Sequence, residues 1–473
     1  MNNSYENEKY LSKKETLIYG IANGGQVFGY SLVTSYLMYF YLNVFSIDAK
    51  IISAVFLIGG IWDVINNPLI GTVIDRKNNT ESKLTSIIKR FTPFQCIVTL
   101  MIFMGPLFIR DSSDKSPEKI IYLLITYFLW EFFYSVTDVS FGGLIAILSP
   151  NPKERQKAIS VSNICCQLAA SLVVVTVPFM LDLSKIGKSN ISIGTVFMIM
   201  GFLAATIGVG LFSLSGYFVK ERIYQTKSKQ SSKELFYGIL HNKPLILLLI
   251  SNFITSFTGI GEAFSTYYYL DVLGYASLSV IAAAPAFILS LFSYSFIGFF
   301  KKMFNNKQLF IISNLSVAAV QLVLFLIGLK NYSDLKIMLP SIIVCNCLIA
   351  LFASVLNTIP TEMLTEATDY AEWKTGLRME GIAFSLKISA VKVYGTTAQG
   401  IAAFLLSIIG YTSAVSGHTV IQTDSVQQKI WIVFSLIPVI IRILSIVPVL
   451  FYSIVNEERN TMLEELKKQR GGL

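Results

Sequence analysis

The sequence predicts an all-α integral membrane protein with twelve transmembrane helices in two six-helix halves. Composition is the first observation: 53% of the 473 residues are hydrophobic, 14% are charged, and the mean hydropathy is +0.60. About 250 hydrophobic residues supply roughly twelve helices of about 20 apolar residues, the length that crosses a bilayer. The second observation is the placement of the basic residues, since most Lys and Arg residues lie outside the apolar segments. This composition excludes a water-soluble enzyme.

Twelve apolar segments are each long enough to span a bilayer as a helix. They lie at residues 15–45, 51–75, 90–109, 119–148, 155–183, 192–219, 243–272, 276–300, 307–329, 336–368, 381–411 and 428–455. A polar stretch rich in Lys and Ser (KERIYQTKSKQSSK) separates the sixth segment from the seventh. We therefore expect an N-terminal half at 1–219, a middle loop at 220–242, a C-terminal half at 243–455 and a tail at 456–473. Two sets of six spans are typical of the major-facilitator fold, although a channel or a scramblase would share this hydropathy profile.

The basic residues predict how these spans are oriented. If both termini lie inside, roughly two thirds of the 38 Lys and Arg residues fall in inner segments, as the positive-inside rule requires. Lys387, Lys392 and Arg442 remain within the spans. We expect cytoplasmic termini in an inner or plasma membrane, and we attribute the net charge of +9 to topology rather than to a nucleic-acid site.

Neither the cysteines nor the glycines indicate covalent or nucleotide chemistry. The five cysteines lie in apolar segments without the spacing of a metal site. The glycine pairs at 24–25 and 142–143 lack the Gly-Lys-Ser/Thr pattern of a phosphate-binding loop. We expect a protein that is not an enzyme, needs no cofactor and runs on solute gradients.

Polar side chains inside the spans indicate a cation site, because a charge in a bilayer needs a partner or an aqueous cavity. In the second span, Asp63, Asn66 and Asn67 stand at i, i+3 and i+4 and share one helical face. In the fourth span, Glu131 and Asp138 lie nearly two turns apart on one stripe. These oxygens suit a hard monovalent or divalent cation, and two acids at close quarters can alternatively share a proton.

The eleventh span supplies a further polar face. Lys392, Thr396 and Gln399 share it at helical spacing and offer a hydrogen-bonding wall. The lysines also provide the alternative to a cation site, because pairing of Lys392 or Lys387 with an acid of the second or fourth span would only tether helices. Lys387 lies about 140° around the helix from Lys392, which favours an inner network or snorkelling.

Aromatic and neutral polar residues in the spans indicate a sugar site, since sugars offer apolar faces for stacking and hydroxyls for hydrogen bonds. The candidate lining residues are Gln26, Tyr30, Trp130, Glu131, Tyr134, Asn163, Tyr267, Tyr268, Tyr394, Thr396 and Gln399. Packing is the alternative role for any one of the aromatic residues. Glu262, in the seventh span, needs an aqueous or paired setting and is a candidate substrate contact or gate partner.

Several longer motifs resemble those of one family of transporters. The second span reads IWDVINNPLIGTVIDR from Ile61 to Arg76, the fourth reads YSVTDVSFGGL from Tyr134 to Leu144, and DYAEWKTGLRMEGIAFS follows the tenth. The motifs KER at 220–222, YYYLDVLG at 267–274 and AVKVYG in the eleventh span extend the match. The chain is therefore similar to the glycoside–pentoside–hexuronide:cation symporters of the major facilitator superfamily.

This resemblance implies alternating access between the two halves, with a central sugar site and a cation site beside it. Asp63, Asn66 and Asp138 match the family's cation-site positions, and Lys392 matches its intramembrane lysine. The coupling ion would be Na⁺ or H⁺, with Li⁺ also compatible. Asn67 replaces a second Asp of the family, and because an amide cannot titrate, coupling weakens and facilitated diffusion becomes an alternative.

The sugar positions depart from the family as well. Where a melibiose-transporting member has its sugar-binding Asp and Arg, this chain has Val27 and Asn163. Gln26 and Asn163 are neutral polar substitutes that suit another glycoside, and Glu262 would provide the acid that the first span lacks.

Charged residues near the inner ends of the spans are candidates for a cytoplasmic gate. They are Asp75, Arg76, Glu154, Arg155, Glu366, Asp369 and Arg378. We expect charge networks that close the cytoplasmic side in one conformation, with solvated loop charges as the alternative.

Two other functions compete with sugar symport. Related transporters carry lipid-like amphiphiles, which the apolar Val27 would tolerate. The second competing function is a substrate sensor that does not transport. It is indicated by Asn67 and by the absence of the charged sugar-binding residues of the family. The partners we expect are a small-molecule sugar or glycoside, a monovalent cation and the lipid bilayer, for a monomeric protein that binds no nucleic acid.

Overall fold

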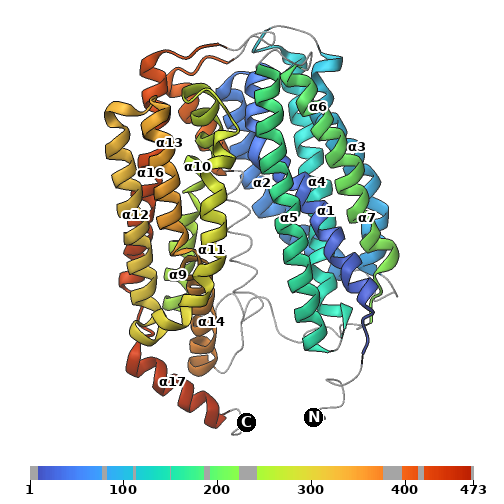
Figure 1. Ribbon diagram of the computed structural model, residues 1–473. Helices are drawn as coiled ribbons and strands as arrows, with labels where there is room; N and C mark the ends of the chain where they lie inside the picture. The colour runs from blue at the N-terminus through green and yellow to red at the C-terminus, as the bar shows by residue number, and fades with distance from the viewer. Residues whose placement is uncertain are drawn as a thin grey trace. The chain divides into compact units, whose positions relative to one another are not determined.

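The computed structural model describes residues 9–76, 83–109, 113–149, 151–185, 192–222, 242–375, 397–413 and 420–469. Every regular element within these ranges is a helix. The chain divides into two compact units, which we call unit 1 (Met1–Lys227 with Tyr411–Ile421) and unit 2 (Ser228–Gly410 with Gln422–Leu473) (Figure 1). The segment limits expected at 219, 242 and 455 stay a prediction.

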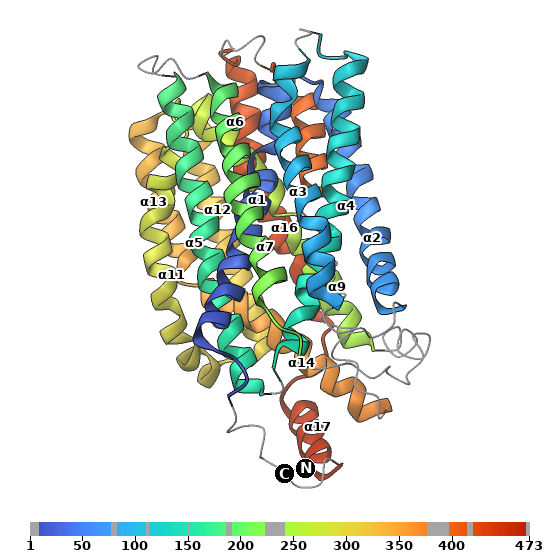
Figure 2. The same ribbon diagram turned by 90° about the vertical axis from the view of Figure 1, so that its right-hand side faces the viewer.

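Unit 1 is a bundle of long helices. In chain order it contains α1 (Lys13–Asn43), α2 (Ala49–Arg76), α3 (Lys83–Phe108), α4 (Pro117–Leu148), α5 (Pro152–Lys185), α6 (Ile193–Leu203), the π-helix η2 (Ala204–Gly208) and α7 (Val209–Phe218). The last three follow one another without a break. Helix α1 packs against α5 and α7, while α4 packs against α2 and α3 (Figure 2). The acids of α4 therefore lie in a helix that contacts both α2 and α3.

Glycines let α1 approach its neighbours closely. A Cβ atom added at Gly25 would lie 2.4 Å from the carbonyl oxygen of Gly208, and one at Gly24 would lie 3.0 Å from that of Cys165. Small residues at such contacts allow close backbone packing in a membrane, where no hydrophobic effect drives helices together. The glycines of α1 thus let this helix pack closely against α5 on one side and against η2 and α7 on another.

Unit 2 is a second helical bundle. It contains α9 (Lys243–Ser256), α10 (Gly259–Tyr267), the π-helix η3 (Tyr268–Val272), α11 (Leu278–Met303), α12 (Asn306–Asn331), α13 (Leu335–Ala350), α14 (Ala353–Thr375), α16 (Asp424–Leu450) and α17 (Asn456–Gln469). Helix α16 packs against α9, α10 and α12, and α11 packs against α13 and α14. A shorter apolar helix at Thr397–Ile409 also belongs to it.

The tail beyond residue 455 forms helix α17, which docks on unit 2. Its Met462 and Leu466 are buried in an apolar cluster that also contains Met363 of α14 and Leu309 of α12. The polar face is held as well, because Nε1 of Trp373 donates to a carboxylate oxygen of Glu465 at 2.6 Å. From the sequence we expected only a tail at residues 456–473, because this segment is polar, and not a docked helix.

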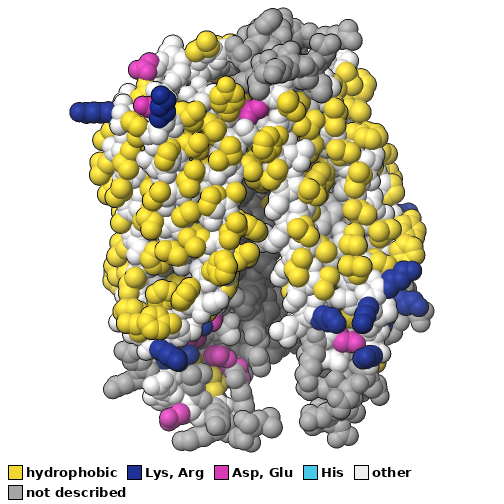
Figure 3. All heavy atoms as spheres, viewed as in Figure 1, with side chains coloured by type: hydrophobic (Ala, Val, Ile, Leu, Met, Phe, Trp, Pro, Cys, Tyr) yellow, Lys and Arg dark blue, Asp and Glu magenta, His cyan; other side chains and the backbone are white. Residues whose placement is uncertain are grey.

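The helices have the length and surface of membrane spans. Among the described residues, nine helical segments are long and apolar enough to cross a bilayer, and two shorter apolar helices lie at Ala49–Trp62 and Thr397–Ile409. On the face drawn in Figure 3, hydrophobic side chains cover the middle of each unit and charged ones gather toward the ends. Helix α1, with 31 residues, is long enough but is not among the nine, because its Gly, Asn, Gln and Tyr residues lower its hydropathy. The expected all-α membrane protein is confirmed, and the span expected at 381–411 lies partly outside the described residues.

Candidate transport site

An acid and an amide meet in the interior of unit 1. Nε2 of Gln26 on α1 donates to Oδ1 of Asp138 on α4 at 3.4 Å. The side chain of Gln26 is only 3% exposed, and its Oε1 accepts no hydrogen bond from the described residues. A buried acceptor without a donor favours a ligand that donates one. The first and fourth spans thus combine at this point.

Aromatic rings continue the same α1–α4 contact one turn further along. The ring centroid of Tyr30 lies 5.1 Å from that of Tyr134, with 18° between the planes, and Trp130 stacks on the other side at 5.0 Å and 13°. Tyr30 follows Gln26 by four residues, and Tyr134 precedes Asp138 by four. Because both intervals are about one helical turn, the ring stack and the acid–amide pair lie along one seam. We call Gln26, Tyr30, Trp130, Tyr134 and Asp138 the α1–α4 seam.

Helix α2, which packs against α4, carries two of the expected amides. Asn66 is 5% exposed, its Nδ2 donates no hydrogen bond to the described residues, and Asn67 is half-buried. Glu131, on α4, is 5% exposed. The side chain of Asp63 lies outside what the structure describes, so the full cation set expected from the second and fourth spans stays a prediction.

Other polar pairs in unit 1 were not anticipated from the sequence. Nδ2 of Asn23 donates to Oγ of Ser162 at 2.7 Å, and the hydroxyl of Thr137 donates to Oε1 of Gln95 at 2.8 Å. Asn163, the expected sugar contact, is exposed on α5 one residue after Ser162. A polar residue in the middle of an apolar run was the signal for Asn23 and Gln95, but the identity of the partner depends on packing.

Unit 2 contains a charged pair as well as stacked rings, since Tyr268 stacks on Phe434 with centroids 4.8 Å apart. Glu262 is exposed on α10 and interacts electrostatically with Arg442 of α16. Nη1 of Arg442 also donates to Oδ1 of Asn314 on α12 at 3.3 Å, and its buried Nε donates to none of the described residues. From the sequence, Arg442 counted only as a charge inside a span, with no role of its own.

The remaining candidates of unit 2 are placed as follows. Tyr267 and Tyr268 are buried, and the hydroxyl of Tyr268 donates to the carbonyl oxygen of Tyr332 at 2.9 Å. Gln399 is half-buried in the helix at Thr397–Ile409. The candidates that lie outside the described residues are Arg378, Lys387, Lys392, Tyr394 and Thr396.

The expected gate residues hold the chain ends within their own units. Oε1 of Glu154 accepts hydrogen bonds from the backbone N–H groups of Tyr10 and Leu11 at 3.1 and 3.2 Å. Glu366 accepts from Nε of Arg459 on α17 at 2.6 Å and from Nδ2 of Asn306 at 2.9 Å. Arg155 and Asp369 are half-buried, and the side chains of Asp75 and Arg76 lie outside the described part of α2.

The KER motif at 220–222 fastens the end of α7 to α1 and α3. Arg222 forms a two-pronged ion pair with Glu15, at 2.9 and 2.6 Å, and Glu221 accepts from the backbone N–H of Thr85 at 2.7 Å. Two parallel hydrogen bonds between a guanidinium and a carboxylate are strong and directional. In the sequence this motif indicated only a resemblance to a family. In the structure it joins the end of α7 to α1 and α3.

Comparison with known proteins identifies relatives along nearly the whole chain. A family model described as "MFS/sugar transport protein" matches residues 18–456. The "Uncharacterized symporter YjmB" of Bacillus subtilis is 28% identical, over 86% of this chain and 86% of its own. The "Isoprimeverose transporter" of Lactiplantibacillus pentosus is 22% identical, over 96% and 91%. The inward-open structure of the xylose transporter XylE from E. coli has a TM-score of 0.60 at 14% identity, covering 95% of this chain and 98% of that one, which supports a likeness of fold.

Proposed function

Because the chain belongs to the family of MFS/sugar transport proteins, we propose that it is a secondary transporter that moves a glycoside or related sugar together with a monovalent cation by alternating access. The α1–α4 seam is the observation that carries this proposal. It places three stacked rings one turn from a hydrogen-bonded acid inside a membrane-spanning bundle. The relatives named as a symporter and as an isoprimeverose transporter support the same class of solute.

The rings account for the sugar. A pyranose has a face of C–H groups that packs on an aromatic ring, while its hydroxyls need hydrogen-bonding partners. Tyr30 is half-buried at the end of the stack. Oε1 of Gln26 accepts no hydrogen bond from the described residues, which suits a sugar hydroxyl.

The acid accounts for the cation. Asp138 supplies carboxylate oxygens inside the bundle, and Asn66 and Asn67 of the adjoining α2 supply amide oxygens. Oxygen ligands of this kind suit Na⁺ or Li⁺, and Asp138 can alternatively take up a proton. Because Asn67 cannot titrate, proton coupling would have to use the acids alone.

The hydrogen bonds of Glu154 and Glu366 with the terminal segments account for gating. We place both termini in the cytoplasm, where Glu154 holds the N-terminal segment and Glu366 holds α17. Each carboxylate ties a terminal segment to the end of its own bundle. During alternating access, each unit would then move together with its terminal segment as one body.

Thermal stabilisation by a panel of candidate solutes tests the proposal. The purified full-length protein is heated with glycosides, pentosides, uronides and lysolipids, each with and without Na⁺. Selective binding to the native state raises the melting temperature. A sugar shift that Na⁺ enlarges supports symport, and a shift from lysolipids alone contradicts it. The Tyr134→Ala variant is the control, because it should lose the sugar shift while remaining folded.

A further inference from the structure

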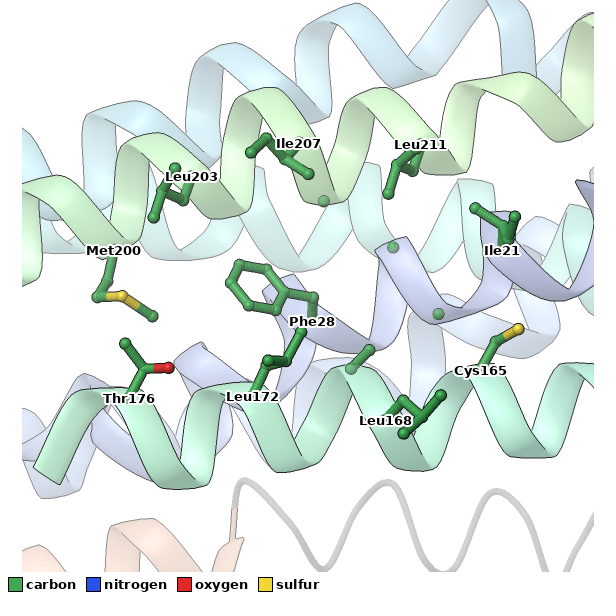
Figure 4. A pocket seen from close by; sticks show the side chains of 14 residues that line it. Ile21, Phe28, Cys165, Leu168, Leu172, Thr176, Met200, Leu203, Ile207 and Leu211 are labelled. Carbon is green, nitrogen blue, oxygen red and sulfur yellow. The ribbon is translucent and has the colours of Figure 1, made fainter. Parts of the chain in front are cut away.

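A hollow opens on the surface of unit 1, on the side of α1 away from the seam. It has a volume of about 430 Å³ and lies between α1, α5 and the continuous segment α6–η2–α7. Phe28 of α1 forms its floor, Leu168 and Leu172 of α5 form one wall, and Leu203 and Ile207 form the other (Figure 4). We call it the α1–α5 groove. Its volume lies within the range of small-molecule sites, about 300–1,000 Å³.

Small residues and a π-helix create the hollow. Gly24, Gly25, Ala169 and Gly208 line it with little or no side chain, while the glycines bring the backbones of α1 and α7 together. The π-helix η2 forms part of the opposite wall, and single π-turns inside α-helices frequently mark functional sites. The groove is thus built by specific departures from regular packing.

The lining of the groove favours a hydrocarbon. Leu168, Leu172 and Ile207 at the rim are 63%, 59% and 54% exposed, on helices that cross the membrane. Among the described residues that line the groove, Thr176 offers a hydroxyl and Cys165 a thiol, and the others are apolar. A water molecule needs two to four polar partners and a sugar needs more, so neither suits this lining.

Basic residues below the groove define what the hydrocarbon is attached to. Lys14 is exposed on α1 and precedes Ile21 of the groove by seven residues, nearly two turns and about 10 Å. Lys157 is exposed on α5 and precedes Leu168 by eleven residues, just over three turns and about 16 Å. Each lysine therefore lies on the same stripe of its helix as the groove. Cations at one end of an apolar channel match an anionic headgroup with an acyl chain.

We propose that the α1–α5 groove binds one acyl chain of an anionic phospholipid whose phosphate contacts Lys14 and Lys157. The lipid packs behind α1, since Gln26 and Tyr30 lie about 140° and 180° around that helix from Ile21. It therefore supports the helix that carries half of the α1–α4 seam. The site does not depend on the identity of the transported solute.

Native mass spectrometry of the full-length protein, stripped of lipid and titrated with phosphatidylglycerol or phosphatidylcholine, tests this site. We expect saturable binding of one phosphatidylglycerol with a clear preference over phosphatidylcholine. The Ala169→Phe variant fills the groove, and displacing even two buried methylenes should weaken binding about tenfold. The matched control is Val174→Phe on the same helix, where an exposed side chain outside the groove is enlarged and binding should not change.

Two further variants separate the headgroup from the chain. Lys14→Gln with Lys157→Gln should remove the preference for phosphatidylglycerol and leave binding of both lipids. If Ala169→Phe misfolds, Leu172→Trp is used in its place. The fluorescence of the added tryptophan should be quenched by phosphatidylglycerol brominated on the acyl chain, already at low mole fractions of that lipid. Equal binding to wild type and Ala169→Phe, quenching that rises only in proportion to bulk lipid, or no headgroup preference in the wild type would overturn the proposal. None of these readouts involves sugar, so failure of the lipid site and failure of the sugar proposal are distinguishable.

Discussion

Both units contain polar side chains within their membrane-spanning helices, and they supply different partners for them. In unit 1 the amide of Gln26 donates to Asp138, and aromatic rings occupy the next turn. In unit 2 the positive charge of Arg442 is met by Asn314 and by the attraction of Glu262. Unit 1 therefore sets an acid beside an amide and rings, the groups that bind cations and sugars, whereas unit 2 sets a cation beside an acid. This difference favours solute binding in unit 1 and a mainly structural charge pair in unit 2.

Replacing the acid of unit 1 should have the largest effect. We expect Asp138→Asn to reduce cation-dependent sugar uptake into proteoliposomes at least about tenfold, because an amide cannot balance a cation's charge. Asp48→Asn is the control, since that carboxylate lies before α2 and accepts from the backbone N–H of Lys50. Uptake by Asp138→Asn that keeps its Na⁺ and pH dependence would remove this residue from the cation site.

The ring stack should respond to loss of the ring and not of the hydroxyl. Tyr134→Ala removes the central ring, on which Tyr30 is stacked. Because one aromatic contact is worth about 0.5–1.5 kcal/mol, losing the ring that orients Tyr30 should lower sugar affinity about tenfold. Tyr134→Phe keeps both ring contacts and should stay within about twofold. Titration calorimetry with the sugar found by thermal stabilisation gives both values. Equal losses in the two variants would show that the hydroxyl, and not the stacking, binds the sugar.

The charge pair of unit 2 should affect stability more than coupling. Arg442→Met leaves Glu262 without its positive neighbour, and we expect the melting temperature to fall by a few degrees. Adding Glu262→Gln should recover part of this loss, because the uncompensated charge is gone. Losses in the double variant equal to the sum of the single losses would mean that the two side chains act independently.

The smallest effect is a gain. Asn67→Asp restores a carboxylate on the half-buried face of α2 beside Asn66, and we expect the Na⁺ concentration for half-maximal uptake to fall a few-fold, as ligand charge increases affinity. Asn78→Asp makes the same change eleven residues further along the chain and is the control. An unchanged Na⁺ response in Asn67→Asp would mean that this side chain does not face the ion.

Sequence patterns predicted most of the fold and supplied candidate residues for the site, but they did not predict which side chains pair. Hydropathy placed the span at 276–300 close to α11, because a bilayer imposes both length and composition on such a helix. Helical spacing predicted that Glu131, Tyr134 and Asp138 share one stripe of a helix, and all three lie in α4. It did not pair Asn314 with Arg442, because which faces of α12 and α16 meet depends on side-chain packing far apart in the sequence.

Local departures from regular helix were also beyond the sequence. The π-helix η2 and the groove beside it arise where Gly25 of α1 presses against Gly208. A glycine in an apolar run signals close packing but not its partner. Helix α17 was missed because its apolar residues are few, and only docking on α14 buries Met462 and Leu466.

The dependence of sugar affinity on the cation tests the central claim, that one site in unit 1 binds both. Sugar dissociation constants of the wild type and of Asp138→Asn are measured by calorimetry with and without Na⁺ and across pH. We expect the cation to tighten sugar binding by about fivefold or more in the wild type, with sugar tightening cation binding by the same factor, and neither effect in Asp138→Asn. A wild-type sugar affinity that is the same at every Na⁺ concentration and pH would contradict coupling at this site.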